Sequence, residues 1–339
     1  MKYLFLDMNY WVQMARGMNT HDTRWATVYS RLREAVEQAI VTIPLFAGHY
    51  LELWHRSDST SREDVGRLMR DLSQYVTLLP IQDIQKLEID AYLETKSGNP
   101  SQVTIENIIG RGVEHAFSSP QGRVRFVESL ETPEDPESAP AEPPVEWDRL
   151  RSLLGSAGWE WFQLVGHPLF NGALGVDRTP EHRHGAKYAQ REENFRKQLM
   201  STPGMKTRLD DVVVLQEFNA ALDLINDACE SRGIDPYTLL LNGHEQNPPD
   251  GIREFVASVP TMNVFAKLRM QMHRDYSYPL KQHDRDDLVM LATTIPYCNW
   301  VITEKTWRHL SHVSCLSSRY HTEVGSDLGA IEDVVQRQL

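Results

Sequence analysis

The chain has 339 residues, of which 41% are hydrophobic and 24% are charged, proportions that suit a globular protein with a sizeable core. Its formal net charge of −12 argues against a broad surface for non-specific duplex binding, because proteins that neutralise many phosphates are usually basic. No apolar run is long enough to cross a bilayer, and the three cysteines form neither a metal-binding pair nor a disulfide framework, so we expect no membrane association and a reducing, cytoplasmic setting.

The N-terminal part of the chain alternates short apolar runs with helical patterns. Nearly continuous apolar runs are typical of strands that are buried on both faces of a parallel sheet. Such runs cover residues 3–8, 41–46 and 75–80. The helical patterns between them cover residues 23–40, 47–56 and 62–73. This order predicts the α/β class, with a Rossmann-like parallel sheet that is flanked by helices.

A long, mainly helical stretch follows the third predicted strand. Residues 131–146 interrupt it with proline and acidic residues, which cannot build a core and so predict a mobile linker. The amphipathic pattern of residues 210–233 predicts a single helix that ends at Gly233. We interpret residues 96–250 as an insertion, and we expect any contact with a second copy or with a partner protein to use it.

The α/β pattern returns near the C-terminus. Helices are predicted over residues 260–275, 283–296 and 304–310. Strands are predicted over residues 299–303 and 319–324. We therefore expect an α/β domain in two parts, separated by the helical insertion. The two parts cover residues 1–95 and 251–339.

Several acidic residues fall where the predicted strands end or where helices begin. They are Asp7, Glu52, Asp284, Asp286, Asp287 and Glu304. Ligands of a parallel α/β sheet gather at the carboxyl ends of its strands, so we expect these side chains to meet at one edge. Carboxylate oxygens suit Mg²⁺ and Mn²⁺, whereas cysteine does not. Asp284, Asp287 and Glu304 also have a structural explanation, because the start of a helix favours negative charge.

The order of these acids resembles the PIN-domain superfamily of nucleases. In that family one acid ends the first strand and a second lies on the helix after the second strand, as Asp7 and Glu52 do here. A third acid opens the helix before the fourth strand, and a fourth follows a threonine at the end of that strand, which Asp287, Thr303 and Glu304 match. The segments LDMN and DDLVMLATTIPYCNWVITEKTW carry the resemblance, and they belong to the two parts of the α/β domain. Two features depart from the family, namely a Glu where the fourth acid is usually Asp, and the long insertion.

The resemblance implies a PIN-like fold and an endonuclease that hydrolyses phosphodiester bonds with Mg²⁺ or Mn²⁺, on RNA in preference to DNA. Toxin-like and defence nucleases are among the members of this family. The chemistry needs a nucleophilic water and stabilisation of the leaving oxygen, and one or two ions supply both. The implied catalytic residues and metal ligands are Asp7, Glu52, Asp287 and Glu304, with Asp284 as a further ligand.

Two polar residues beside the acids are expected to support them. Asn9 would orient Asp7 or a metal-bound water. Thr303 would orient Asp287 or the substrate phosphate in the same way. Both positions lie directly after a predicted strand, where the acids are expected to gather.

A basic cluster lies in the predicted insertion, on a chain that is acidic as a whole. Arg191, Arg196 and Lys197 fall on a predicted helix. Such a cluster either guides a nucleic-acid strand toward a catalytic site or forms a solvated helix face, and both interpretations stay open at this point.

Two other functions also stay open. A haloacid-dehalogenase-like phosphatase likewise ends its first strand in Asp and uses Mg²⁺, although its motif normally carries a second Asp two positions later, where this chain has Asn9. A catalytically inert PIN-like scaffold, whose insertion binds a partner, is the second alternative. The complete set of acids argues against a scaffold, because an inert protein has no use for it.

Overall fold

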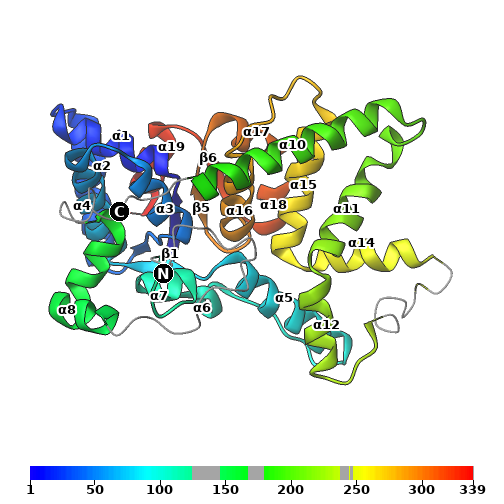
Figure 1. The fold of residues 1–339 in the computed structure, drawn as a ribbon. Coiled ribbons are helices and arrows are strands. Elements are labelled where there is room, and N and C mark those ends of the chain that lie inside the picture. The colour runs from blue at the N-terminus through cyan, green and yellow to red at the C-terminus, as the bar shows by residue number, and fades with distance from the viewer. Residues whose placement is uncertain (124–145, 167–178, 237–243, 245–246, 339) are drawn as a thin grey trace.

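The computed structural model describes residues 1–123, 146–166, 179–236, 244 and 247–338 (Figure 1). The predicted linker at 131–146 lies outside these residues except for Glu146, where a helix begins. Within the described residues, no helix is both long enough and apolar enough to cross a membrane.

A four-stranded parallel sheet forms the centre of the α/β part. Its strands are β1 (Lys2–Leu6), β2 (Val41–Thr42), β5 (Trp300–Ile302) and β6 (Glu323–Gly325), in the order β2-β1-β5-β6. The predicted α/β class and the parallel sheet are therefore confirmed. Leu6 lies opposite Ile302 in the register of β1 and β5, so both strands end at the same level. This register brings the residues that follow the two strands together.

The third predicted strand does not join this four-stranded sheet. It is β3 (Val76–Leu78), which pairs in antiparallel fashion with β4 (Ile109–Arg111), a strand that the sequence pattern did not predict. A single parallel bridge between Leu45 and Thr77 connects it to the chain beyond β2. Leu45 both donates to the Val76 oxygen and accepts from the Leu78 nitrogen. β4 is too short to show an alternation of apolar and polar residues, which explains why it was missed.

Helices cover both faces of the sheet (Figure 1). Side chains alternate along β1, so Leu4 and Leu6 pack into one core while Tyr3 and Phe5 pack into another. Core residues on the Leu4 side come from α1 (Met8–Asn19), α2 (Thr23–Glu37), α3 (Ala47–His55), α4 (Ser59–Ser73), α7 (Gly112–Phe117), α8 (Glu146–Val165) and α19 (Leu328–Gln338). The other core takes residues from α5 (Ile81–Lys96), α6 (Ile105–Ile108), α15 (Pro260–Arg274), α16 (Asp284–Thr294), α17 (Lys305–Val313) and α18 (Leu316–Tyr320).

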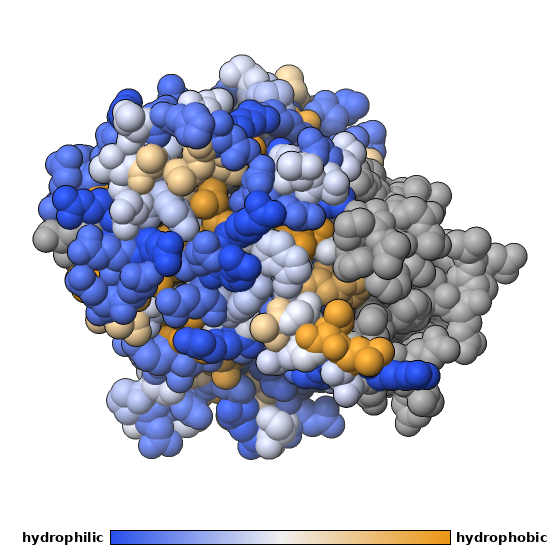
Figure 2. Space-filling view, turned by 90° about the vertical axis from the view of Figure 1, so that its left-hand side faces the viewer, coloured by the Kyte–Doolittle hydropathy of each residue, from blue (hydrophilic) through white to orange (hydrophobic). Residues whose placement is uncertain are grey.

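The outer side of the first helical layer is mainly polar. Figure 2 shows the side of the molecule on which α1, α2 and α4 lie, where hydrophilic residues cover most of the surface and apolar residues form small patches. On α2, for example, Trp25, Val28 and Leu32 are buried on one side of the helix and its other side is charged. This pattern is the usual one for a helix that packs on a sheet with its opposite face in water.

A third core holds the helical part of the chain together. It joins α5 and α15 to α10 (Thr179–Ser201), α11 (Leu209–Ala220), α12 (Leu222–Glu230) and α14 (Pro248–Ser258), with the short 3₁₀ helix η2 (Lys206–Arg208) between α10 and α11. The single helix predicted over residues 210–233 is wrong, because it breaks at Ala221 into α11 and α12. α11 packs on α14 and α15, whereas α12 packs on α5, so tertiary contacts set the break.

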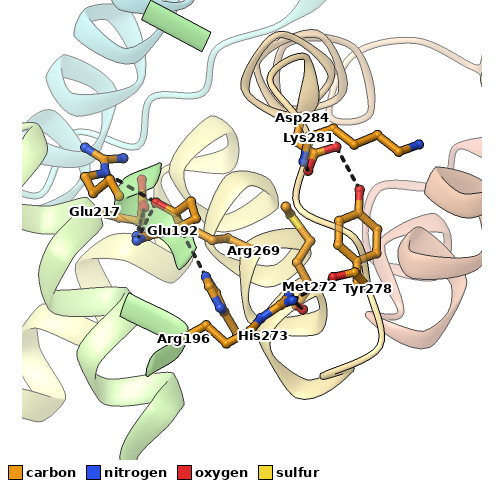
Figure 3. Close-up of polar contacts among 10 residues, drawn as sticks. Glu192, Arg196, Glu217, Arg269, Met272, His273, Tyr278, Lys281 and Asp284 are labelled. Carbon is orange, nitrogen blue, oxygen red and sulfur yellow. Dashed lines mark hydrogen bonds and ion pairs between the residues drawn. The ribbon is translucent and has the colours of Figure 1, made fainter. Parts of the chain in front are cut away.

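Ion pairs between buried side chains link α10 to α15 (Figure 3). Glu192 on α10 accepts hydrogen bonds from the Arg269 guanidinium at 2.8 and 3.0 Å and lies 2.8 Å from His273 Nε2. These partners hold the pKa of Glu192 at about 2, although burial alone would raise it. Arg269 also donates to Glu217 on α11 at 2.9 Å. Removing one partner from a buried network of this kind costs roughly 3–5 kcal/mol, so α10 is firmly held.

One strand boundary and one helix also differ from the sequence prediction. The strand predicted over residues 319–324 begins only at Glu323, because α18 occupies the preceding residues and ends at His321 in a left-handed conformation with φ of 56°. α1 was not predicted. Asp7 caps this helix by accepting from the Asn9 backbone N–H, so the helix starts directly after β1 without a loop.

Candidate metal centre

The carboxyl ends of β1 and β5 meet and bring two predicted site residues into contact. The Asp7 backbone N–H donates to the Ile302 oxygen at 3.0 Å, which continues the pairing of the two strands by one residue. The Thr303 hydroxyl donates to Asp7 Oδ2 at 3.3 Å, and both side chains are buried. Tyr10 on α1 holds Thr303 from behind by donating to its carbonyl oxygen at 3.1 Å. Asp7 is thus fixed at the floor of the site.

Asn9 connects two of the acids. Its backbone N–H donates to Asp7 Oδ1 at 3.4 Å, and its side-chain Nδ2 donates to Glu304 Oε1 at 2.7 Å. Asp7 follows β1 and Glu304 follows β5, so Asn9 spans the two strand ends. An amide is suited to this position, since it donates to a carboxylate without adding charge.

Asp287 reaches the same region from the first turn of α16. Trp307 on α17 donates its indole N–H to Asp287 Oδ2 at 2.9 Å. Among the described residues, Trp307 is the one hydrogen-bond donor to this carboxylate, which leaves Oδ1 available to a ligand. Burial raises the pKa of Asp287, and repulsion from the Asp7 carboxylate adds to this rise, so the two acids lie near each other as the sequence analysis expected.

Glu52 completes the cluster from α3. Its side chain is exposed, and within the described part of the chain no hydrogen bond holds its carboxylate. The surrounding protein nevertheless displaces enough water to raise the pKa of Glu52 to about 8, assisted by repulsion from Asp7 and Asp287.

Three carboxylates of the cluster, those of Asp7, Glu52 and Asp287, have raised pKa values. Burial raises the pKa of Asp7 to about 6 and that of Asp287 to about 8, and the charge of Glu304 adds to both shifts. Gathering like charges in this way is unfavourable unless a proton or a cation compensates it. We refer to Asp7, Glu52, Asp287 and Glu304 as the acid cluster.

The donors of the acid cluster suit a hard divalent cation, since all are carboxylate oxygens. In the described residues, however, no three His, Cys, Asp or Glu side chains stand close enough to hold one ion together. A cation at this site would therefore draw the carboxylates inward or contact some of them through water. Mg²⁺ commonly keeps several waters and uses only one or two carboxylates directly, so the arrangement is compatible with it.

Asp284, the fifth expected ligand, has a different environment. Its carboxylate accepts from the Tyr278 hydroxyl at 2.9 Å and from the Lys281 backbone N–H at 2.7 Å, as Figure 3 shows. Both oxygens thus close the turn that leads into α16, and the side chain is buried. We therefore leave Asp284 out of the proposed ligand set. Asp286, two residues further along α16, is exposed, and we leave it out of the ligand set as well.

His49 is a supporting residue that the sequence analysis did not assign to the site. It is fully buried on α3, where Nδ1 accepts from the Phe46 backbone N–H at 3.3 Å. Nε2 lies 3.0 Å from the Leu6 oxygen, so it carries the proton and donates. His49 therefore ties the helix of Glu52 to the strand end that precedes Asp7. Its spacing, one helical turn before Glu52 in an apolar helix, was the available signal.

The predicted basic cluster is not one surface. Arg196 is buried and donates to the carbonyl oxygens of Tyr278 at 2.6 Å and Met272 at 2.8 Å (Figure 3). The prediction that Arg196 binds substrate is therefore wrong, because its guanidinium donates hydrogen bonds to main-chain oxygens inside the protein. Arg191 and Lys197 are exposed, and Arg191 lies 3.3 Å from the Glu192 carboxylate.

No protein-family model matches the chain, and no curated protein and no solved structure match it either. The case for a function therefore rests on the chemistry of the acid cluster and of the residues that hold it.

Proposed function

We propose that the protein is a Mg²⁺- or Mn²⁺-dependent endonuclease of the PIN-like type, which hydrolyses phosphodiester bonds in RNA. The observation that carries this proposal is the convergence of the acid cluster, whose members come from four separate segments of the chain, at the carboxyl ends of β1 and β5. If these acids served only as helix caps, they would have no need to lie close together, because each cap bonds the backbone of its own helix.

The surroundings of the acids support the same proposal. Thr303 and Asn9 both contact the cluster, although their side-chain partners differ from those expected. Thr303 bonds Asp7 in place of Asp287, and the Asn9 side chain bonds Glu304. The order of the acids along the chain agrees with the PIN-like pattern, with the third acid on the helix that leads into β5. Asn9 also counts against a haloacid-dehalogenase-like phosphatase, since an amide donating to Glu304 cannot act as the second acid of that motif.

Each residue of the cluster has a defined task in this mechanism. Asp7 and Asp287, both partly held by hydrogen bonds, would bind the ions directly, and Glu52 and Glu304 would complete the set. Bound ions supply an activated water and neutralise charge on the leaving oxygen. Thr303 holds Asp7 in place, while Trp307 orients Asp287 toward the cluster. Because burial and mutual repulsion raise the pKa values of Asp7 and Asp287, a cation at this site would compete with protons for these carboxylates.

A cleavage assay with matched variants tests the proposal. End-labelled single-stranded RNA is incubated with the protein in Mn²⁺, in Mg²⁺ and in EDTA. We expect cleavage with either ion, none in EDTA and none for Asp7→Asn. The control Asp223→Asn, an exposed acid on α12, should cleave at the wild-type rate. Full activity in EDTA, or equal activity of both variants, would refute the proposal. Hydrolysis of small phosphoesters without RNA cleavage would favour the phosphatase instead.

A further inference from the structure

A cavity of about 410 Å³ lies between the α/β part and the helical part of the chain. Its walls come from α5 and the loop that follows it, from α14 and the start of α15, from the turn after α16, and from the end of α18. No residue of the acid cluster lines it. Small-molecule sites usually have volumes of roughly 300–1,000 Å³, so this cavity is large enough for a small ligand.

The cavity and the acid cluster lie at opposite ends of the strands. Pro296 and Tyr297 line the cavity and precede β5, whereas Glu304 follows the same strand. Tyr320 lines the cavity from α18 and precedes β6. A ligand in the cavity would therefore not touch the acid cluster, and its binding is separate from the proposed cleavage.

Glu88 on α5 is a buried carboxylate in the wall of the cavity, with 2% of its surface exposed. It accepts from the Thr261 backbone N–H at 3.1 and 3.2 Å and from the Thr261 and Tyr297 hydroxyls. Three neutral donors thus serve about four acceptor positions. Among the described residues no cation forms an ion pair with Glu88, and burial raises its pKa to about 7. The start of α15 supplies only about +0.5 of a charge, so Glu88 remains without a full counter-charge.

The charged residues that line the cavity are negative on balance. Besides Glu88 they are Glu254 on α14 and Lys96 at the end of α5, which are bonded to each other at 2.5 Å. The second oxygen of Glu254 is bonded to His244 at 2.6 Å, so both of its oxygens have partners. The side chains of Lys96 and Glu254 are 27% and 41% exposed, which places this ion pair where the cavity meets water. Glu88 is therefore the buried charge that a cationic ligand would neutralise.

Three tyrosine rings give the cavity aromatic walls, and two of them are fixed by their hydroxyls. Tyr297 donates to Glu88, and the Tyr320 hydroxyl accepts from the Asn263 amide at 2.8 Å. The third ring is that of Tyr92 on α5. Aromatic rings pack well against flat rings, and their faces attract cations. Rings that are already held in place lose little freedom when a ligand binds.

We propose that this cavity binds a small aromatic amine, with the ammonium group of the ligand beside Glu88 and its ring against the tyrosines. A buried carboxylate without a cationic partner favours a ligand that carries a positive charge. The aromatic walls favour a flat, apolar body. An anionic ligand such as a nucleotide is disfavoured, because the buried charge of Glu88 would repel it.

Calorimetric titration with phenethylamine tests the site. Two comparison ligands each lack one feature, since phenethyl alcohol has the ring without the charge and butylamine has the charge without the ring. Glu88→Gln removes the carboxylate, whereas Ala91→Leu fills the cavity from the same helix and leaves Glu88 in place. The matched control is Glu160→Gln. Glu160 also accepts from a backbone N–H at a helix start, that of Val113 on α7, but it does not line the cavity.

We expect phenethylamine to bind equally to the wild type and to Glu160→Gln. Affinity should fall roughly tenfold or more in Glu88→Gln, and by a similar factor for phenethyl alcohol on the wild type, because a charged partner is lost in each case. Ala91→Leu should abolish binding, and it decides the outcome if circular dichroism shows that Glu88→Gln does not fold.

Several results would overturn the inference. They are no saturable binding of phenethylamine by the wild type at millimolar concentrations, unchanged binding by Ala91→Leu, an equal affinity for phenethyl alcohol, or a higher affinity for butylamine.

Discussion

The four carboxylates of the acid cluster are held to different degrees. Asp7 is bonded by Thr303 and by the Asn9 backbone, Asp287 by Trp307, and Glu304 by the Asn9 side chain. Glu52 on α3 has no such bond among the described residues, and its side chain is exposed, as that of Glu304 is. We infer that a cation would move the Glu52 side chain furthest, because the fewest contacts resist its rotation.

Asp287→Asn should abolish metal-dependent cleavage and raise the melting temperature of the metal-free protein. The change preserves an acceptor oxygen for Trp307 and removes one of several repelling charges. Cleavage rate, Mn²⁺ affinity by calorimetry and thermal unfolding in EDTA measure the three effects. Asp284→Asn is the comparison. It should retain most of the activity and lose stability, because its oxygens bond Tyr278 and Lys281. If Asp284→Asn were inactive and Asp287→Asn active, Asp284 would be the metal ligand and Asp287 the structural residue.

His49→Phe should reduce both stability and turnover. The new ring keeps the stacking on Phe5, but the Phe46 N–H loses its acceptor, which costs roughly 1–3 kcal/mol. The Leu6 oxygen keeps a bond from Trp11 at 3.1 Å, so the strand end itself is retained. Because Glu52 lies on the loosened helix, Mn²⁺ affinity should fall as well.

His49→Gln separates positioning from simple destabilisation. Its amide can donate to the Leu6 oxygen, so it should recover part of the Mn²⁺ affinity and of the turnover. Unfolding by urea, calorimetry and cleavage at saturating Mn²⁺ are compared for the two variants. If His49→Phe is unstable but cleaves at the wild-type rate, His49 does not position Glu52.

The start of α16 is held by α10 through a chain of three contacts. Arg196 on α10 binds the carbonyl oxygens of Met272 and Tyr278, and the Tyr278 hydroxyl binds Asp284. Asp287 lies three residues after Asp284 on the same helix. The helical part of the chain therefore supports the metal centre from behind, even though it contributes no carboxylate to it.

Arg196→Met should lower the free energy of unfolding by roughly 2–4 kcal/mol, because two carbonyl oxygens lose a charged donor. Methionine fills similar apolar space, so the loss reports the hydrogen bonds. Chemical denaturation gives the free energy of unfolding. Fluorescence anisotropy of a labelled single-stranded RNA, measured over a series of salt concentrations, gives the slope of log affinity against log salt. The slope should equal that of the wild type, since Arg196 is buried. A shallower slope with unchanged stability would return Arg196 to the substrate surface.

The metal-free protein as a whole should lose stability as the pH rises. The pKa values of Asp7, Glu52 and Asp287 are raised by folding to about 6, 8 and 8. Between their ordinary values and these raised ones, the folded state binds more protons than the unfolded chain, so the free energy of unfolding falls with increasing pH. Burial lowers the pKa of His49 to about 3, which has its effect only below the ordinary histidine value. Between about pH 6.5 and 8, the change in the free energy of unfolding with pH therefore comes from the acidic residues and not from His49.

Denaturation of the metal-free protein at several pH values measures this slope, and Glu52→Gln assigns it. Glu88 and Glu160, with pKa values of about 7, also contribute to the wild-type slope below neutral pH. The difference between the wild type and Glu52→Gln should therefore grow between pH 7 and 8. Added Mn²⁺ should stabilise the wild type more at pH 8 than at pH 6, because the ion competes with protons. Identical slopes for the two proteins would show that Glu52 is not desolvated.

Local patterns were sufficient for much of the fold. β1 and β5 are short apolar runs, and α4, α15 and α16 begin and end within a few residues of their predicted positions. Apolar periodicity is a local property, so it can be read without knowing what packs on the element. The predicted elements are wrong where tertiary packing overrides the apolar periodicity. The break at Ala221 follows from different partners for α11 and α12, and β4 exists only because β3 lies beside it.

For the candidate site, chain direction in a parallel sheet was enough to predict that Asp7 and Glu304, which follow neighbouring strands, lie close together. It was not enough to predict that Asp284 bonds Tyr278 and Lys281 instead. Tertiary structure alone decided which partner each acid has. Asn9 and Glu304 are 295 positions apart in the chain and yet bonded at 2.7 Å. It also decided that Arg196 is buried while Lys187 is exposed. The burial and the partners of a side chain depend on elements from distant parts of the chain, which no local pattern contains.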